Sequence, residues 1–226
     1  MKKYVRHLSV WTIAVACTAA VAFFNARPAD PADDFSFTVY REVSAEEIAK
    51  LMSAKQVTEI LVDHLDLFPR SQAPKLAAHL LSLCTRFRFD PSFILSLIQV
   101  ESSFRIKAVS PVNARGLMQL MPDTAELIAR KLGVKYRQPD HLFDPYTNLT
   151  LGIAYLSMMR DRYRGFPPYF IAAYNAGPGK LDGLLLNGKF KPVETRKYHE
   201  AIRSRVPYFK FYRSGGRSLR SKKIRV

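Results

Sequence analysis

The segment ILSLIQVESSF, residues 94–104, is decisive for the fold because it predicts a buried helix that carries one charged residue. Ile94, Leu97 and Ile98 recur at helical spacing, which predicts a helix face that packs inward. Glu101 continues this face, since it follows Leu97 by four residues and Ile98 by three. Apolar surroundings would raise the pKa of this carboxyl and suit it to general acid catalysis. The alternative, which the local pattern alone favours, is that Glu101 turns to solvent at the helix end.

Helix-start signals recur along the chain and predict an all-α fold. Ser44 and Glu47 form a capping box before a long periodic stretch. Asp90 followed by proline predicts a helix from about residue 91 to 103, and Gly133 is expected to end a later helix. No alternating strand pattern occurs, so at most a short hairpin is expected after Phe104. Further predicted helix starts are the Asp123–Glu126 capping box, Asp144-Pro145, Pro167, Pro178 and a last helix over about 195–212.

The composition allows one ordinary domain with extensions. The chain has 226 residues, of which 48% are hydrophobic, so it can form a core. Its formal net charge of +16 favours an anionic partner without identifying one. The sequence contains no zinc-ligand spacing, no Gly-rich phosphate loop and no known nucleic-acid motif, so no metal, cofactor or nucleic acid is expected. Cys84 lies in an apolar helical pattern and is expected to be a buried thiol.

The two ends of the chain differ from the middle. Residues 1–26 are expected to be a signal peptide or a signal anchor, because three basic residues precede an uncharged run at 8–24. Both alternatives place the remainder outside the cytoplasm. Residues 27–86 are predicted to be a linker and a helical N-terminal extension. Residues 213–226 are predicted to be a basic flexible tail.

Several motifs occur in order across residues 87–212. They are Glu101-Ser102, G-L-M-Q at 116–119, N-L-x-x-G-x-x-Y-L at 148–156, A-Y-N-A-G at 173–177 and E-T-R-x-Y at 194–198. This set resembles the soluble-type lytic transglycosylases, relatives of goose-type lysozyme that cleave peptidoglycan. The resemblance implies a lysozyme-like, all-α catalytic domain at 87–212.

The resemblance also implies a reaction that needs one carboxyl. In this family the glutamate, here Glu101, protonates the oxygen between N-acetylmuramic acid and N-acetylglucosamine. The acetamido group of the substrate is thought to stabilise the sugar cation. The resulting carboxylate then takes the proton of the C6 hydroxyl, which closes a 1,6-anhydro ring without water. Most glycosidases use two carboxylates; Asp123 and Asp144 are candidates for a second, but both are better explained as helix caps.

Other motif residues are implied to line the site, each with a structural alternative. Ser110 and Gln119 would hydrogen-bond the substrate or tie the loop together. Met121 would form an apolar wall or pack in the core. Tyr174 and Asn175 would contact the acid or the sugar, and could also end a helix. Tyr198 would form a further wall, and the sequence departs from the family pattern at the following His199, where an apolar residue is usual.

The leading hypothesis is a peptidoglycan lytic transglycosylase of the periplasm or cell-envelope space. Its expected partners are glycan strands and, through the N-terminal segment, a membrane; a monomer is expected. The alternatives are a hydrolytic muramidase and an inactive peptidoglycan-binding or scaffold module. The net charge alone would suggest a nucleic-acid binder, which the export signal and the motifs oppose.

Overall fold

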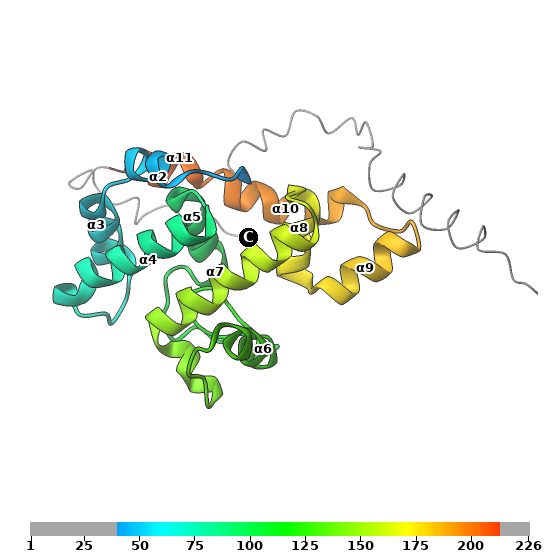
Figure 1. Ribbon diagram of the computed structural model, residues 1–226, viewed down its shortest axis with the longest axis horizontal. Coiled ribbons are helices and arrows are strands. Elements are labelled where there is room, and N and C mark those ends of the chain that lie inside the picture. The colour runs from blue at the N-terminus through cyan, green and yellow to red at the C-terminus, as the bar shows by residue number, and fades with distance from the viewer. Residues whose placement is uncertain (1–39, 213–226) are drawn as a thin grey trace, which may run out of the picture. The chain divides into compact units, whose positions relative to one another are not determined.

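The computed structural model describes residues 40–212, and this part of the chain is α-helical (Figure 1). No strand is assigned within it, and only isolated antiparallel bridges join Val109 to Arg115 and Arg115 to Leu120. The expected all-α fold with at most a short hairpin is therefore confirmed. The expected signal segment, most of the linker and the basic tail lie outside the described residues. Within residues 40–212 no helix has the length and hydrophobicity needed to cross a membrane.

The order of helices is the one that the start signals predict, with two additional breaks. The helices and single 3-10 turns are α2 (Ala45–Leu51), α3 (Ala54–His64), η2 (Arg70–Gln72), α4 (Ala73–Phe87), α5 (Pro91–Ser102), α6 (Pro122–Leu132), η3 (Pro139–Phe143), α7 (Pro145–Arg162), α8 (Pro167–Ala176), α9 (Pro178–Leu186), α10 (Pro192–Arg203) and α11 (Val206–Lys210).

The first break divides the periodic stretch after Ser44 into α2 and α3. The predicted capping box of Ser44 and Glu47 is present. A second capping box, formed by Ser53 and Gln56, begins α3 and was not recognised in the sequence. Because its two side chains satisfy backbone N–H groups of a new first turn, a new helix starts there.

The predicted capping box at Asp123 is wrong. Helix α6 starts at Pro122 with Met121 as its N-cap, and no side chain caps it. Asp123 lies exposed in the first turn, where its charge favours the positive end of the helix dipole. The predicted last helix over 195–212 is also divided, because α10 ends at Arg203 and α11 starts at Val206, with a proline in its first turn.

Helix α7 lies between two apolar cores. Leu149 and Ile153 of α7 belong to the larger core, whereas Leu151 and Ala154 belong to a smaller core with α6. The helix packs against α4, α6 and α8, and Figure 1 shows it running past these elements. Because α7 contacts both cores, it fixes the α6 side of the fold relative to the helices on its other side.

The N-terminal extension shares the larger core. Helix α3 packs along α4, and α4 packs along α7. Ile60 and Leu76 lie in the same cluster of buried side chains as Phe93 and Ile98 of α5. The boundary between residues 86 and 87 stays a prediction, but apolar packing is continuous across it.

Helix α5 is buried on all sides over its first two turns. The predicted cap is present, since the Asp90 side chain accepts a hydrogen bond from the Ser92 N–H at 2.8 Å. Every residue from Pro91 through Ile98 is buried, and the Ser96 hydroxyl donates to the Ser92 carbonyl at 2.6 Å. The helix leaves the core only at its last turn, which carries Glu101.

The cap of α5 provides a test of this arrangement. Asp90→Ala removes the acceptor for the first free N–H of the buried helix and should lower the free energy of unfolding by about 1 kcal/mol. Asp123→Ala is the matched control, because it removes an exposed carboxylate that caps nothing and should change stability by less than about 0.5 kcal/mol. Urea unfolding of both variants measures this, and equal losses would contradict the capping assignment.

Candidate active site

Glu101 is half-buried at the end of α5, and its carboxylate accepts a hydrogen bond from the Tyr198 hydroxyl of α10. Burial raises the pKa of the carboxyl to about 7, although the Tyr198 hydrogen bond acts in the opposite direction. A carboxyl with this pKa is largely protonated just below neutral pH and can both give and take a proton near pH 7. The solvent-facing alternative for Glu101 is therefore wrong.

The end of α5 is fixed by two residues with left-handed backbone. Ser103 has φ of 51° and Phe104 has φ of 61°, a conformation that non-glycine residues adopt rarely. The Phe104 side chain is fully buried, with ring centroids 5.2 Å from His64 and 5.8 Å from Phe209. The left-handed backbone turns the chain sharply after Glu101. Burial of the Phe104 ring compensates for this unfavourable conformation.

Tyr174 of α8 lies close enough to the Glu101 carboxyl for the two to interact electrostatically. The Glu101 charge contributes to raising its pKa, after the larger effect of burial. Its hydroxyl donates to the Met118 carbonyl at 2.8 Å, and its ring centroid lies 5.4 Å from that of Tyr155. Tyr174 therefore connects the carboxyl region to the G-L-M-Q loop.

Asn148 holds this loop from the α7 side, a role that the sequence analysis did not assign. The residue is fully buried, and its side-chain oxygen accepts from the Met118 N–H at 2.8 Å. Its amide nitrogen donates to the carbonyls of Arg115 and Leu142, both at 3.0 Å. The Met118 backbone is thus bound at its N–H by Asn148 and at its carbonyl by Tyr174. The available sequence signal was a polar residue in an apolar helical pattern, three residues after the Pro145 of a capping Asp-Pro pair.

Two motif glycines are explained by these close approaches. Gly116 has φ of 77°, and a Cβ there would lie 2.2 Å from the Asn148 amide nitrogen and from the Leu142 carbonyl oxygen. A Cβ on Gly152 of α7 would lie 2.6 Å from the Met118 sulfur. Both positions require glycine so that the loop can approach α7.

Ser110 and Gln119 tie the loop together. The Ser110 hydroxyl accepts from the Ala114 N–H at 3.0 Å. The Gln119 amide nitrogen donates to the Gly116 carbonyl at 3.0 Å and to the Ala108 carbonyl at 3.3 Å. The structural alternative given for these residues is thus observed, and their contacts with substrate stay a prediction.

Met121 and Asn175 are accessible to a ligand. Met121 is 40% exposed at the start of α6, so the alternative that it packs in the core is wrong. Asn175 is exposed on the last turn of α8, one residue after Tyr174. Their roles in binding stay predictions.

His199 takes the place of the apolar residue that usually follows the tyrosine. Its side chain is 3% exposed, and burial lowers its pKa to about 4. The ring is therefore neutral at pH 7 and packs edge-on against Tyr40, with centroids 5.6 Å apart. This departure from the family pattern preserves the packing of α10.

Among the residues whose side chains the structure describes, which leave out 192–194, no second acid acts on the Glu101 carboxyl. Burial raises the pKa of Glu101 and the Tyr198 hydrogen bond lowers it, and neither influence comes from a carboxylate. Asp144 caps α7, where it accepts from the Thr147 N–H at 2.9 Å, and Asp123 is exposed on α6. Among the residues of 40–212 whose side chains are described, a set that omits 192–194, no cluster of His, Cys, Asp and Glu could hold a metal ion.

Comparison with known proteins identifies the family. Residues 82–192 match the Transglycosylase SLT domain family. The chain is 32% identical over 133 residues to the soluble lytic murein transglycosylase of Escherichia coli K12, covering 54% of this chain and 21% of that protein. It is 40% identical over 107 residues to the membrane-bound lytic murein transglycosylase C of Histophilus somni 2336, covering 42% of this chain and 29% of that protein.

A solved structure agrees with the sequence matches. The crystal structure of the 70-kDa soluble lytic transglycosylase of E. coli superposes with a TM-score of 0.51 at 28% identity, covering 77% of this chain and 32% of that one. The chain spans about a fifth of the length of the E. coli relative it matches in sequence. Residues 82–192 form a transglycosylase SLT domain, and the resemblance seen in the motifs is confirmed.

The close approach at Gly116 gives a prediction for the loop. Gly116→Ala should lower the free energy of unfolding by about 3 kcal/mol or more, because the new Cβ would collide with Asn148 and strain a left-handed backbone. Gly133→Ala is the matched control: its φ is 66° but no atom lies within 4 Å of the added Cβ. The control should cost only about 1 kcal/mol. Chemical unfolding compares the two, and equal costs would rule out the steric explanation.

The buried carboxyl gives a prediction for stability against pH. A folded pKa of about 7, raised from 4.5, means that the native state binds more protons than the unfolded state between these values. The contribution of Glu101 to stability is thus present below pH 4.5 and lost as pH rises through 7. Glu101→Gln should therefore become more stable relative to wild type by up to about 3 kcal/mol between pH 4 and pH 8.

Urea unfolding at these two pH values measures the gain. Glu46→Gln serves as the control, because Glu46 is exposed on α2 and its replacement should leave the pH dependence unchanged. Stability curves for Glu101→Gln and wild type that run parallel from pH 4 to pH 8 would show that burial does not hold the proton.

Proposed function

We propose that this chain is a peptidoglycan lytic transglycosylase in which Glu101 acts first as the acid and then as the base. The observation that carries the proposal is the half-buried Glu101 carboxyl, which accepts a hydrogen bond from Tyr198 and whose pKa is set by burial and this hydrogen bond, with no contribution from a carboxylate whose side chain is described. One carboxyl suffices when the attacking group belongs to the substrate, because no water has to be activated.

The first step is the transfer of the Glu101 proton to the bridging oxygen between N-acetylmuramic acid and N-acetylglucosamine. The bond from the muramoyl C1 to this oxygen breaks, and its electron pair leaves with the N-acetylglucosamine hydroxyl. The acetamido group of the muramoyl residue stabilises the cation at C1. The Glu101 carboxylate next accepts the proton of the C6 hydroxyl, whose oxygen bonds to C1 and closes the 1,6-anhydro ring. Glu101 ends protonated, as it began.

Burial and Tyr198 each support one half of this cycle. Burial favours the protonated acid that the first step needs. The hydroxyl of Tyr198 donates to the carboxylate and lowers the cost of forming it in the low-dielectric site. Tyr174 keeps the G-L-M-Q loop beside the carboxyl through Met118. Ser110, Gln119, Met121 and Asn175 are proposed to contact the glycan along this loop and the end of α8.

The names of the relatives support the proposed substrate and the proposed role of a glutamate as the essential acid. The relatives are named as lytic murein transglycosylases, both soluble and membrane-bound. One solved relative, from Pseudomonas aeruginosa, is an inactive mutant in which a glutamate is replaced by glutamine. Another is a complex of the 70-kDa enzyme with bulgecin A. These names support an envelope location, while residues 1–26 as signal or anchor and 87–212 as the catalytic domain stay predictions.

A hydrolytic muramidase is the second candidate. It would use water as the attacking group and would normally need a second carboxylate to activate it. The two carboxylates considered from the sequence do not favour it, since Asp144 caps α7 and Asp123 is exposed on α6. An inactive binding module would not require a carboxyl whose pKa is raised to about 7, so this feature favours an enzyme.

Digestion of purified sacculi tests the proposal. The wild-type chain should release muropeptides with 1,6-anhydro ends, and Glu101→Gln should reduce this release at least about a hundredfold. Asp123→Asn is the matched control and should retain the wild-type rate and products. Mass analysis separates anhydro ends from reducing ends. Reducing ends from the wild-type chain would favour the muramidase, and unchanged release by Glu101→Gln would remove the assigned acid.

A further inference from the structure

Tyr40 lies behind the candidate site, in contact with each of the three helices that form it. The side chain is 2% exposed, although the sequence analysis placed it in the linker and extension. Its ring packs edge-on against Phe93 of α5 at 5.2 Å, Phe170 of α8 at 6.2 Å and His199 of α10 at 5.6 Å. These helices carry Glu101, Tyr174 and Tyr198, respectively.

The polar end of Tyr40 is bound to the residue next to Tyr198. The Tyr40 hydroxyl lies 3.4 Å from the His199 carbonyl oxygen, to which it donates, and 3.3 Å from the His199 Nδ1. The charge of Arg203, one turn further along α10, also acts on this hydroxyl. Because Tyr198 and His199 are adjacent on one helix, Tyr40 holds α10 at the residue next to Tyr198.

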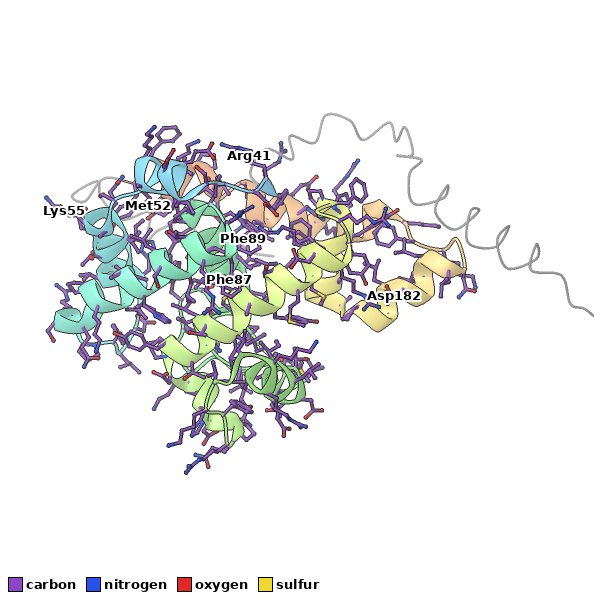
Figure 2. All side chains as sticks on the ribbon, viewed as in Figure 1. Arg41, Met52, Lys55, Phe87, Phe89 and Asp182 are labelled. Atoms are coloured by element: carbon purple, nitrogen blue, oxygen red, sulfur yellow. The ribbon has the colours of Figure 1, made fainter. Side chains whose placement is uncertain are left out.

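The segment that carries Tyr40 is anchored at its other end. The Val43 N–H donates to the Arg88 carbonyl at 3.3 Å. Glu42 pairs with Arg88 at 3.3 Å and with Arg160 of α7 at 3.5 Å. The Arg160 side chain is 6% exposed, and its guanidinium carbon lies 4.3 Å from the Phe89 ring centroid. Figure 2 marks Arg41 on this segment and Phe89 on the turn between α4 and α5.

We propose that Tyr40 is a positioning residue that holds α10 so that the Tyr198 hydroxyl stays on the Glu101 carboxylate. Neither Tyr40 nor Tyr198 lies within the matched residues 82–192, so the site of this chain is completed by packing from outside the family match. The placement follows from contacts alone, and its effect on catalysis rests on the proposed function. The competing explanation is that Tyr40 contributes to stability only.

A double-mutant cycle separates the two explanations. Tyr198→Phe removes a hydrogen bond to the carboxylate and should raise the pKa of Glu101. Tyr40→Ala should raise it in the same direction, because α10 loses its support. In the double variant, Tyr40→Ala should add no further rise, since the hydrogen bond it controls is already absent. Tyr40→Phe keeps the ring contacts and should retain most of the wild-type behaviour.

The pKa of Glu101 is followed by carbon-13 NMR titration of the full chain labelled at glutamate side chains, with Glu101→Gln identifying the signal. Activity on sacculi is measured against pH in parallel. The pH at which activity is half lost should rise in Tyr40→Ala and Tyr198→Phe alike, and kcat of Tyr40→Ala should fall about tenfold or more. Tyr40→Leu, which fills more of the same space, is measured alongside in case Tyr40→Ala does not fold.

Ile60→Ala is the matched control, because it removes a fully buried side chain from α3. It should lower stability without moving the Glu101 titration. An unmoved titration in both Tyr40→Ala and Tyr40→Leu would overturn the proposal, as would a further rise from Tyr40→Ala in the Tyr198→Phe background. If the titration moves as expected but the wild-type chain does not cleave sacculi, the positioning role holds and the proposed function fails.

Discussion

The structure depends on one interaction: a carboxyl at the point where a fully buried helix leaves the core, joined to a tyrosine hydroxyl from the far end of the chain. Burial opposes the charge on Glu101, and the hydrogen bond from Tyr198 opposes the burial effect. The balance leaves the carboxyl with a pKa near the pH at which it has to exchange protons. Burial alone would raise the pKa further, and the hydrogen bond alone would lower it.

To keep this pKa, the fold has to hold the end of α5 and the loop after it in fixed positions. The end of α5 has to be rigid, and the left-handed Ser103 and Phe104 are tolerated because the Phe104 ring is buried. The loop after it has to approach α7 closely, which Asn148 and two glycines permit. A buried carboxyl also costs stability above neutral pH, so the cores on both sides of α7 have to compensate for it.

Local sequence signals predicted the helices and the position of the acid. Asp90 and Asp144 cap where they were expected to cap, because capping depends on neighbouring residues only. The predicted capping role of Asp123 was wrong because the helix already starts at Pro122, with Met121 as its N-cap. The burial of Ile94, Leu97 and Ile98 followed from spacing, but the burial of the opposite side of α5 did not. Helices α10 and α11, which are far away in the sequence, also pack against α5.

Contacts between residues far apart in the sequence could not be predicted from it. Tyr198 lies 97 residues from Glu101, and Tyr40 lies 159 residues from His199, so no local pattern links them. Asn148 could be placed in a motif, but its bonds to Met118, Arg115 and Leu142 require the folded loop. His199 shows how a departure from a family pattern is accommodated: a neutral buried imidazole packs where an apolar side chain is usual.

The central claim is that one buried carboxyl carries the proton through the reaction while the substrate supplies the attacking oxygen. Cleavage of sacculi in water enriched in oxygen-18 tests this most directly, with mass analysis of the new muramoyl ends. The account predicts anhydro ends that contain no oxygen-18, because the C6 oxygen of the substrate bonds to C1. Oxygen-18 at C1 of reducing muramoyl ends would show that water attacks, and would contradict the single-carboxyl mechanism.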